Sequence, residues 1–326
     1  MKAIQINKDS SGYRATLEEL NEDELPVNDV KVDVEFSTLN YKDALAITGK
    51  GPVVRSFPMI PGIDLSGTVR ESKDPRFKAG DAVILNGWGV GEKFPGGYGE
   101  VASLKADWLI HRPSSLSAWT AMAIGTAGYT AMLCANALRD AGIAPGSGEI
   151  VVSGATGGVG SIAIKILSKR GYQVTAISGK DSAQEYLKSL GASEVIDRAE
   201  FEATSKPLLK ERWIGAIDTC GGAILANLCA SIKYGGVVTA CGLAQSMDLP
   251  TTVAPFILRG VSLIGIDSVM CPLEKRKLAW DDLAKEIQES DLSEIVQTIG
   301  LEDVLNVAPG MIDGTTKGRY VVNVRQ

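Results

Sequence analysis

The feature that most constrains this chain is a glycine-rich turn that follows an apolar strand and precedes an amphipathic helix. The strand candidate is Ile150–Val152, and glycines stand at positions 154, 157, 158 and 160. The next apolar residues recur at i, i+3, i+4, i+7 and i+8, as on one helix face: Val159, Ile162, Ala163, Ile166 and Leu167. Gly171 then stands where a C-terminal helix cap is expected. The segment predicts a strand–turn–helix unit of a parallel α/β sheet.

This turn is predicted to hold the pyrophosphate of a dinucleotide. Glycine permits a tight turn, a close approach of the backbone to the anion and close packing of the helix on the strand. The anion then lies at the helix N-terminus, where free N–H groups and the dipole favour it. The spacing is Gly-x-x-Gly-x-x-Gly, so a structural turn without a ligand is the alternative. The predicted contacts are Ala155, Thr156, Gly157, Gly158, Val159 and Gly160.

The end of the next strand predicts which dinucleotide binds. An NAD site typically has an Asp or Glu about 20 residues on, which binds the ribose 2′-hydroxyl. Here the strand ends in Ser178-Gly179-Lys180, which contains no acid. A carboxylate would repel a 2′-phosphate, whereas Ser178 and Lys180 can bind one, and Arg198 beyond the third strand adds a second cation. We therefore expect NADPH, with solvated loop charges as the alternative.

The chain is predicted to form two domains of different character. Up to residue 123 it is rich in turn signals and strand patterns, such as Val30–Phe36 and Ala82–Leu85, which favours a small barrel-like β domain. Over residues 124–268 apolar strands alternate with helix-length segments, which predicts a doubly wound parallel sheet. The six strands expected there are Ile150–Val152, Gln173–Ile177, Glu194–Ile196, Ala216–Thr219, Val237–Cys241 and Ser262–Ile266.

The C-terminal segment is expected to return to the first domain, so that residues 1–123 and 269–326 form one domain. A helix is expected over Glu274–Glu289 and a weaker helical stretch near Glu302–Leu305. Residues Arg319–Val324 alternate like a terminal strand.

Composition argues against several classes of partner. A net charge of −6 and a pI of about 5.1 disfavour nucleic acid, which usually requires a basic face. The five cysteines form no Cys-x-x-Cys pair and His111 is the single histidine, so no metal site is predicted. No apolar run reaches the roughly 18–20 residues of a membrane helix, and the start has no signal-peptide core. We expect a cytoplasmic protein without a membrane partner.

Several segments resemble the medium-chain dehydrogenase/reductase superfamily, and the resemblance covers nearly the whole chain. These are Leu190–Asp197, Asp218–Gly222 and Gly235-Gly236. Two further segments resemble its zinc-free quinone oxidoreductase branch, namely Asn40–Asp43 and Pro61–Asp64. Three more resemble the acryloyl-CoA reductase subfamily: Ile84–Gly91, Gly96–Tyr98 and Pro255–Val261.

The resemblance implies a GroES-like β-barrel catalytic domain and a Rossmann domain, both without zinc. Zinc alcohol dehydrogenases have Gly-His-Glu where this chain has Gly62-Ile63-Asp64, and their four-cysteine loop is missing between Asp81 and Asp107. The subfamily implies NADPH-dependent reduction of the C=C bond of acryloyl-CoA to propanoyl-CoA. An NADPH quinone or enone reductase, and a non-catalytic cofactor-binding protein on the same fold, are the alternatives.

Position in the superfamily implies further cofactor contacts. Thr130 is expected to open a helix near the nicotinamide. Lys317-Gly318-Arg319 is expected to bind the nicotinamide side or a substrate phosphate. The other contacts implied at strand ends are Gly242, Leu243, Ile266, Asp267 and Ser268. Ordinary turn chemistry is the alternative for each of these loop residues.

Tyr41 and Asp43 are the leading residues on the substrate side, because their loop stands where zinc relatives have a metal-binding cysteine. Tyr41 is expected to donate a proton to the substrate α-carbon, with water as the other source. A Tyr41 ring packed over the nicotinamide, and an Asp43 carboxylate that only holds the loop, are the alternatives. Asn40 is expected to shape the same loop.

A homodimer is expected through the last strand of the parallel sheet. Val261–Ile266 is apolar, and an exposed apolar edge strand invites pairing with another chain. Pairing across a two-fold axis would make one continuous sheet through both subunits.

Overall fold

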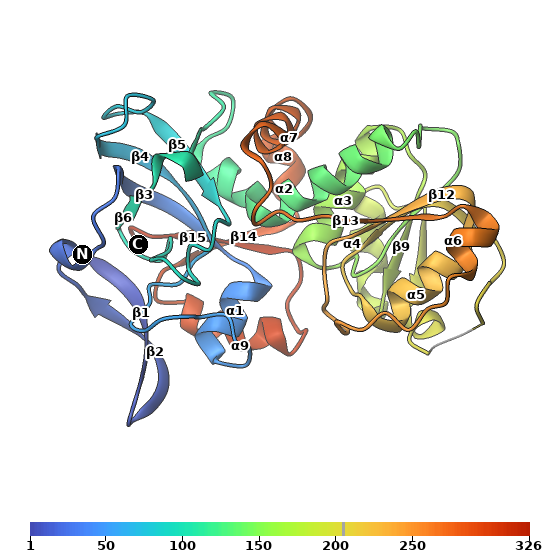
Figure 1. Ribbon diagram of the computed structural model, residues 1–326, viewed down its shortest axis with the longest axis horizontal. Coiled ribbons are helices and arrows are strands. Elements are labelled where there is room, and N and C mark those ends of the chain that lie inside the picture. The colour runs from blue at the N-terminus through green and yellow to red at the C-terminus, as the bar shows by residue number, and fades with distance from the viewer. Residues whose placement is uncertain (204–205) are drawn as a thin grey trace. The chain divides into compact units, whose positions relative to one another are not determined.

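The chain divides into two compact units in the computed structural model, which describes residues 1–203 and 206–326, the side chain of Asp181 excepted. One unit comprises Met1–Thr126 and Ser268–Gln326, and the other comprises Ala127–Asp267 (Figure 1). The C-terminal segment thus belongs to the same unit as the N-terminal segment.

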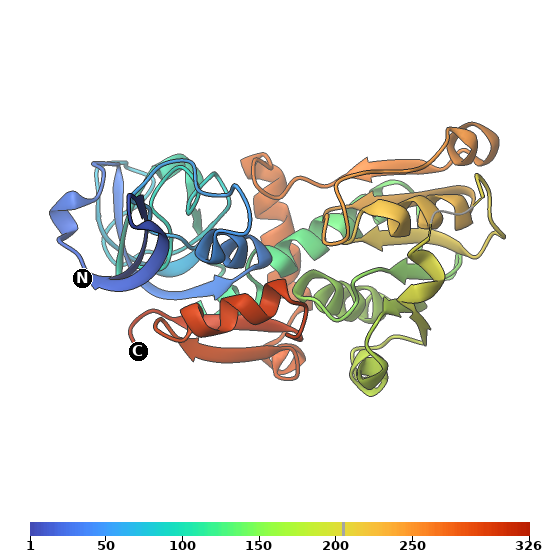
Figure 2. The same ribbon diagram turned by 90° about the horizontal axis from the view of Figure 1, so that it is seen from below.

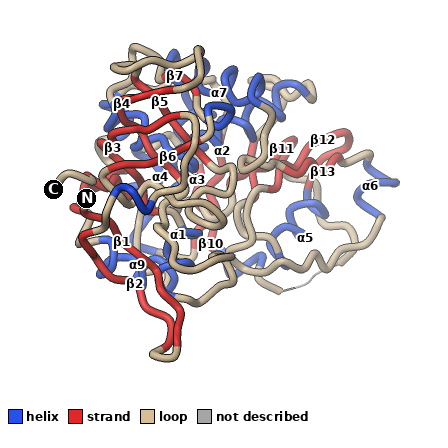
Figure 3. Tube along the Cα trace, turned by 60° about the vertical axis from the view of Figure 1, so that its left-hand side comes forward, coloured by secondary structure: helices blue, strands red, loops and turns tan. Residues whose placement is uncertain are grey.

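The first unit is built on a mostly antiparallel sheet whose strands run in the order β14-β15-β3-β4-β5-β7, with β6 also paired to β3. Its strands are β3 (Val30–Leu39), β4 (Asp64–Ser72), β5 (Ala82–Asn86), β6 (Val101–Leu104), β7 (Ile110–His111), β14 (Val296–Gly300) and β15 (Arg319–Asn323). A separate antiparallel ribbon pairs β1 (Lys2–Asp9) with β2 (Gly12–Glu19), as the red tube of Figure 3 shows. Alternation along β3 buries Val30, Val32 and Val34 in the core of this unit.

Two helices of the first unit lie near the predicted C-terminal helices, with shifted bounds. The helices of this unit are α1 (Tyr41–Thr48), α7 (Leu273–Glu286), α8 (Glu289–Leu292) and α9 (Val304–Ile312), with short 3-10 turns η1 (Glu22–Glu24) and η2 (Ala106–Trp108). The predicted helix over Glu274–Glu289 was too long, because the backbone turns extended at Ile287 before α8 begins. The predicted terminal strand is confirmed as β15, which pairs antiparallel with β3. Strand β14 was missed, because its short, half-polar sequence has no clear period.

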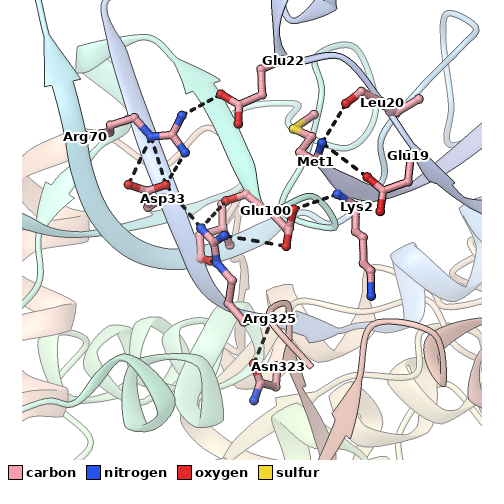
Figure 4. A network of polar contacts seen from close by, with 11 residues as sticks. Met1, Lys2, Glu19, Leu20, Glu22, Asp33, Arg70, Glu100, Asn323 and Arg325 are labelled. Atoms are coloured by element: carbon pink, nitrogen blue, oxygen red, sulfur yellow. Dashed lines mark hydrogen bonds and ion pairs between the residues drawn. The ribbon is translucent and has the colours of Figure 1, made fainter.

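A polar network ties the two ends of the chain to this sheet (Figure 4). The Asp33 carboxylate on β3 accepts hydrogen bonds from Arg70 on β4 and from Arg325 beyond β15. Arg70 also pairs with Glu22, and Arg325 donates to the backbone oxygen of Glu100. The Arg70 guanidinium holds the pKa of Asp33 below its usual value. Because these groups are more than a third exposed, their ion pairs add little to stability.

The second unit is a six-stranded parallel sheet in the order β10-β9-β8-β11-β12-β13, which confirms the predicted doubly wound fold. Its strands are β8 (Ile150–Val152), β9 (Val174–Ser178), β10 (Glu194–Asp197), β11 (Trp213–Asp218), β12 (Ile232–Ala240) and β13 (Ser262–Gly265). All six lie where the sequence predicted strands, with ends shifted by a few residues. The order reverses between β8 and β11, and this switch point is where such sheets bind ligands.

Helices cover both faces of the parallel sheet, as Figure 2 shows. They include α3 (Gly158–Lys169), α4 (Gln184–Ser189), α5 (Gly222–Ser231) and α6 (Ala254–Arg259), with 3-10 turns η3 (Asp181–Ala183) and η4 (Arg198–Phe201). The crossovers through α3 and α5 run in opposite directions along the sheet. Because such crossovers are right-handed, α3 and α5 lie on opposite faces.

Helix α2 (Ala118–Asp140) spans the boundary of the two units and is interrupted at Gly125, which has φ 47° and ψ −160°. Judged by length and composition alone, this helix, among the residues that the structure describes, is long and apolar enough to cross a membrane. The sequence prediction overlooked it, because its apolar residues are interspersed with threonine and glycine. Of its most apolar window, 78% is buried inside the protein, as in the core helix of a globular fold.

Candidate cofactor-binding and substrate-side residues

The glycine turn leaves β8 at Val152 and enters α3 at Gly158, with Gly157 as the N-cap. A Cβ at Gly160 would lie 2.5 Å from the Gly154 carbonyl oxygen and 2.7 Å from the Ala155 Cα, so only glycine lets the helix pack on the turn. Gly154 has φ +57°, a conformation that favours glycine. Gly157 is exposed, and Thr156, Gly158 and Val159 are half-buried. The first turn of α3 therefore presents its backbone N–H groups toward an open face.

The predicted amphipathic helix after this turn is confirmed. Ile162, Ala163, Ile166 and Leu167 are fully buried, and Gly171 has φ +82° directly after the α3 C-cap. The buried face is wider than predicted, because Ile164 is also fully buried under the neighbouring elements.

Ser178, Gly179, Lys180 and Arg198 come together at the adjoining strand ends. Ser178 ends β9, is buried, and its hydroxyl oxygen accepts from the Lys180 N–H at 3.1 Å. In the β9–β10 ladder Ser178 is paired with Asp197, so Arg198 leaves β10 beside the end of β9. The Ala155 N–H donates to the Ile177 carbonyl at 3.2 Å, which joins the glycine turn to the same strand. These residues and the glycine turn therefore lie together at the carboxyl ends of β8, β9 and β10.

Other predicted contacts follow strand ends of the second unit. Gly242 comes after β12, and a Cβ there would lie 2.1 Å from the Thr219 carbonyl oxygen. Leu243 is 52% exposed. Ile266 and Asp267 follow β13, and the Ile266 N–H donates to Ala240.

Two residues of the predicted cofactor set, Thr130 and Ser268, are placed differently from the expectation. Thr130 does not open a helix, because α2 resumes at Thr126 and Thr130 lies buried one turn later. Ser268 and Lys317 belong to the first unit, and Lys317 is exposed.

Arg319 was predicted with Lys317 as a ligand-binding residue, but its side chain points into the protein. It is 2% exposed, and its Nε donates to the Ala123 carbonyl at 2.8 Å. Burial lowers its pKa to about 10. A buried guanidinium is retained only where acceptors surround it, which here are protein groups.

On the substrate side, Tyr41 is the first residue of α1 and its side chain is 40% exposed. Asp43 lies at the third position of the same helix and is fully buried. Its carboxylate accepts from the Asn40 N–H at 2.9 Å and from the Ile63 N–H at 3.0 Å. With Asn40 it forms a capping box at the start of α1. These contacts favour the alternative in which Asp43 holds the loop and Asn40 shapes it.

Asp64 is the residue that sequence reasoning missed. Its carboxylate is fully buried at the start of β4 and accepts hydrogen bonds from segments that are far apart in the chain. The donors are the Thr38 hydroxyl at 2.6 Å, the Asn40 amide at 3.0 Å, the Asn86 amide at 2.8 Å, the Thr126 N–H at 2.8 Å and the Thr126 hydroxyl. The available signal was an acid inside the apolar pattern of a strand, which implies a buried charge with dedicated partners.

The five cysteines of the chain are all free, and four of them are buried. Burial raises the pKa of Cys220, and it raises the pKa of Cys229 to about 12. The half-buried Cys241 donates its S–H to the Asp218 carbonyl at 3.4 Å, and its pKa is well above the usual value because of the neighbouring Cys134 thiol and burial. Over residues 1–203 and 206–326, no three His, Cys, Asp or Glu side chains are grouped to hold a metal ion.

Family models match both units. Residues 26–114 match the alcohol dehydrogenase GroES-like domain, and residues 158–288 match the zinc-binding dehydrogenase family. A GroES-like unit combined with a doubly wound sheet and a glycine turn is the architecture of a medium-chain dehydrogenase/reductase.

Full-length relatives narrow this assignment. The chain is 55% identical to the probable acrylyl-CoA reductase AcuI of Escherichia coli strain K12, over 99% of this chain and 100% of that protein. It is 46% identical to the acrylyl-CoA reductase AcuI of Ruegeria pomeroyi, over 99% and 98%. The crystal structure of the yhdH oxidoreductase from Salmonella enterica in complex with NADP matches with a TM-score of 0.97 at 53% identity, covering 99% of both chains. The chain therefore belongs to the acrylyl-CoA reductase family of the medium-chain dehydrogenase/reductases.

The pH dependence of stability tests the buried state of Asp43. Burial is the largest influence on its carboxyl group and raises its pKa from 3.8 to about 7. A raised pKa in the folded state means that the associated stability is present below about pH 4 and is lost as the pH rises to about 7. In urea titrations from pH 4 to 7, Asp43→Asn should flatten this decline relative to the wild type. An unchanged slope in the variant would contradict a raised pKa for Asp43.

Proposed function

We propose that this chain reduces the C=C bond of acryloyl-CoA to propanoyl-CoA with NADPH. The observation that carries the proposal is identity of 55% and 46%, over nearly the full length, to two proteins named as acrylyl-CoA reductases. The residues at the cofactor edge of the second unit support the choice of NADPH, and the NADP complex of the Salmonella enterica relative supports it independently.

The chain's own residues fit an NADPH molecule. The glycine turn packs closely on its neighbours, because a Cβ at Gly154 would lie 2.1 Å from the Thr219 Oγ1 and a Cβ at Gly160 would lie 2.5 Å from the Gly154 carbonyl oxygen. The N-terminus of the twelve-residue α3 that follows this turn would hold the pyrophosphate. Ser178, Lys180 and Arg198 would hold the 2′-phosphate at the end of β9. When bound, NADPH supplies the hydride that adds to the β-carbon of the unsaturated thioester.

The residues that we propose to act on the substrate side lie at the N-terminus of α1. Addition at the β-carbon places negative charge on the thioester oxygen, and the α-carbon then takes up a proton. Tyr41, at the exposed start of α1, is the residue that we propose as proton donor. We propose Asp43 as a positioning residue, because its buried carboxylate accepts from the backbone N–H groups of Asn40, which precedes Tyr41, and of Ile63.

Parallel assays with NADPH and acryloyl-CoA, crotonyl-CoA or a quinone test the activity. We expect kcat/KM to be highest for acryloyl-CoA, because the full-length relatives are named for that substrate. Faster oxidation of NADPH with the quinone would overturn the proposal in favour of a quinone reductase. NADPH binding without turnover on any of the three would indicate a non-catalytic protein.

Replacing Tyr41 with Phe tests the proton donor. The variant keeps the ring but lacks the hydroxyl, so we expect kcat with acryloyl-CoA to fall by about 100-fold, the scale of general acid catalysis, with little change in KM. Tyr234→Phe is the matched control, because that side chain is 76% exposed on the other unit. Wild-type turnover in Tyr41→Phe would assign the proton to water.

We also propose a homodimer that pairs along β13. This strand lies at the edge of the sheet, and its Leu263 and Ile264 are half-buried in the single chain. Ile257 and Leu258 of the preceding α6 are 72% and 61% exposed, which adds apolar surface at the same edge. A cytoplasmic location is part of the proposal, because NADPH and acyl-CoA carry phosphate charges that do not cross a bilayer unaided.

Sedimentation velocity at micromolar concentration tests the dimer. The wild type should sediment as twice the 34.4 kDa chain. Ile264→Lys should shift it to the monomer, because a charged side chain on an edge strand blocks pairing. A wild-type monomer under these conditions would refute the dimer.

A further inference from the structure

We propose that Gly179 is a specificity-determining residue, because the absence of a side chain there gives the Arg198 guanidinium the place from which it binds the 2′-phosphate. The inference rests on the proposed NADPH dependence. It concerns a residue that has no side chain to contact the phosphate and that acts through Arg198. The preference for NADPH over NADH then depends on free space at the end of β9, as well as on the absence there of the Asp or Glu of an NAD site.

The space above Gly179 is filled by one side chain. A Cβ built on Gly179 would lie 2.9 Å from the Arg198 Cζ, 3.1 Å from its Nε and 3.1 Å from its Nη2. Real Cβ atoms essentially never approach a neighbour within 3.0 Å, so the guanidinium and a methyl group cannot share this position. The guanidinium therefore lies directly on the backbone of residue 179.

Backbone conformation does not require glycine at this position. The φ angle of Gly179 lies outside the left-handed region, in contrast to Gly154 and Gly171. Alanine is therefore conformationally acceptable at 179. Because the atoms in its way are the far end of a flexible side chain, alanine would displace Arg198 instead of distorting the sheet. The requirement for glycine is thus a requirement on where Arg198 lies.

Glu202 fixes the orientation of this guanidinium. The Arg198 Nε donates to the Glu202 Oε1 at 2.6 Å, one turn along the chain. Neither Nη1 nor Nη2 donates a hydrogen bond to a residue within the described ranges 1–203 and 206–326. Glu202 thus occupies the Nε side, and the two terminal nitrogens remain for a phosphate, which guanidinium groups bind with two parallel N–H donors.

The other nearby carboxylate is engaged elsewhere. Asp197 is paired with Ser178 in the ladder, but its Oδ1 accepts from the Ala199 N–H at 2.9 Å and caps η4. The glycine turn lies beside the same strand end, because the Ala155 N–H donates to the Ile177 carbonyl of β9.

Binding of NADPH and NADH to Gly179→Ala, measured by titration of the full-length protein without acyl-CoA, tests the proposal. We expect the Kd for NADPH to rise about tenfold, the effect of one charge-assisted hydrogen bond, and the Kd for NADH to stay the same. The Tm should also stay the same, because the methyl group moves only an exposed side chain. A purely structural role for Gly179 would lower the Tm and weaken both cofactors equally, which would overturn the proposal.

Gly157→Ala is the matched control. Its Cβ would lie 3.3 Å from the Gly154 carbonyl oxygen, on the turn proposed to hold the pyrophosphate that NADPH and NADH share. This variant should weaken both cofactors to the same extent, in contrast to Gly179→Ala.

A double-mutant cycle with Arg198→Ala decides whether Gly179 acts through that side chain. If it does, Gly179→Ala has no further effect on NADPH binding once Arg198 is absent. Additive losses would overturn the proposal, as would equal wild-type Kd values for NADPH and NADH. Because no acyl-CoA enters these measurements, failure to reduce acryloyl-CoA would reject the proposed substrate and leave this result independent of it.

Discussion

The hydrogen-bonded Asp64 carboxylate is the interaction on which the first unit depends. A buried charge is tolerated only when donors surround it, and those donors must come from somewhere in the fold. Here they come from the end of β3, the cap of α1, the end of β5 and the residue after the break in α2. One carboxylate thus joins segments that are far apart in the sequence. The most distant donors, Thr38 and Thr126, are 88 positions apart.

The same constraint explains the conformation around Tyr41. Asn40 binds both Asp64 and Asp43 through its amide, so the α1 N-terminus is held from two directions. Arg319 lies on the other side of this amide, with Nη1 at 3.4 Å from the Asn40 Oδ1. Burial is the main cause of the raised pKa of Asp43, and the neighbouring Asp64 carboxylate raises it further. The α1 N-terminus that carries Tyr41 is therefore held by buried polar contacts, although the Tyr41 ring itself is exposed.

Sequence reasoning succeeded where the determinant of structure is local. The six strands of the second unit and helix α3 follow from apolar periodicity and turn residues, which act over a few positions. It failed for Asp64 and Arg319, because their partners are distant in sequence and no period links them. Thr130 was misplaced for a related reason, since the break in α2 lies at Gly125, where a glycine inside an apolar run looks like ordinary helix. The Ser178-Gly179-Lys180 segment was located correctly, but the closeness of Gly179 to Arg198 requires the β9–β10 register.

The burial of the cysteines has a chemical consequence for an enzyme of the proposed kind. An α,β-unsaturated thioester is an electrophile that alkylates thiolates, and a thiol reacts only to the extent that it is ionised. Burial raises the pKa of Cys220 and Cys229, and the hydrogen bond with the Cys134 thiol together with burial raises the pKa of Cys241, so these three side chains carry almost no thiolate at neutral pH. The packing that buries Cys220 and Cys229 in the core of the second unit thereby shields these two thiols from alkylation by the compound that the enzyme is proposed to consume.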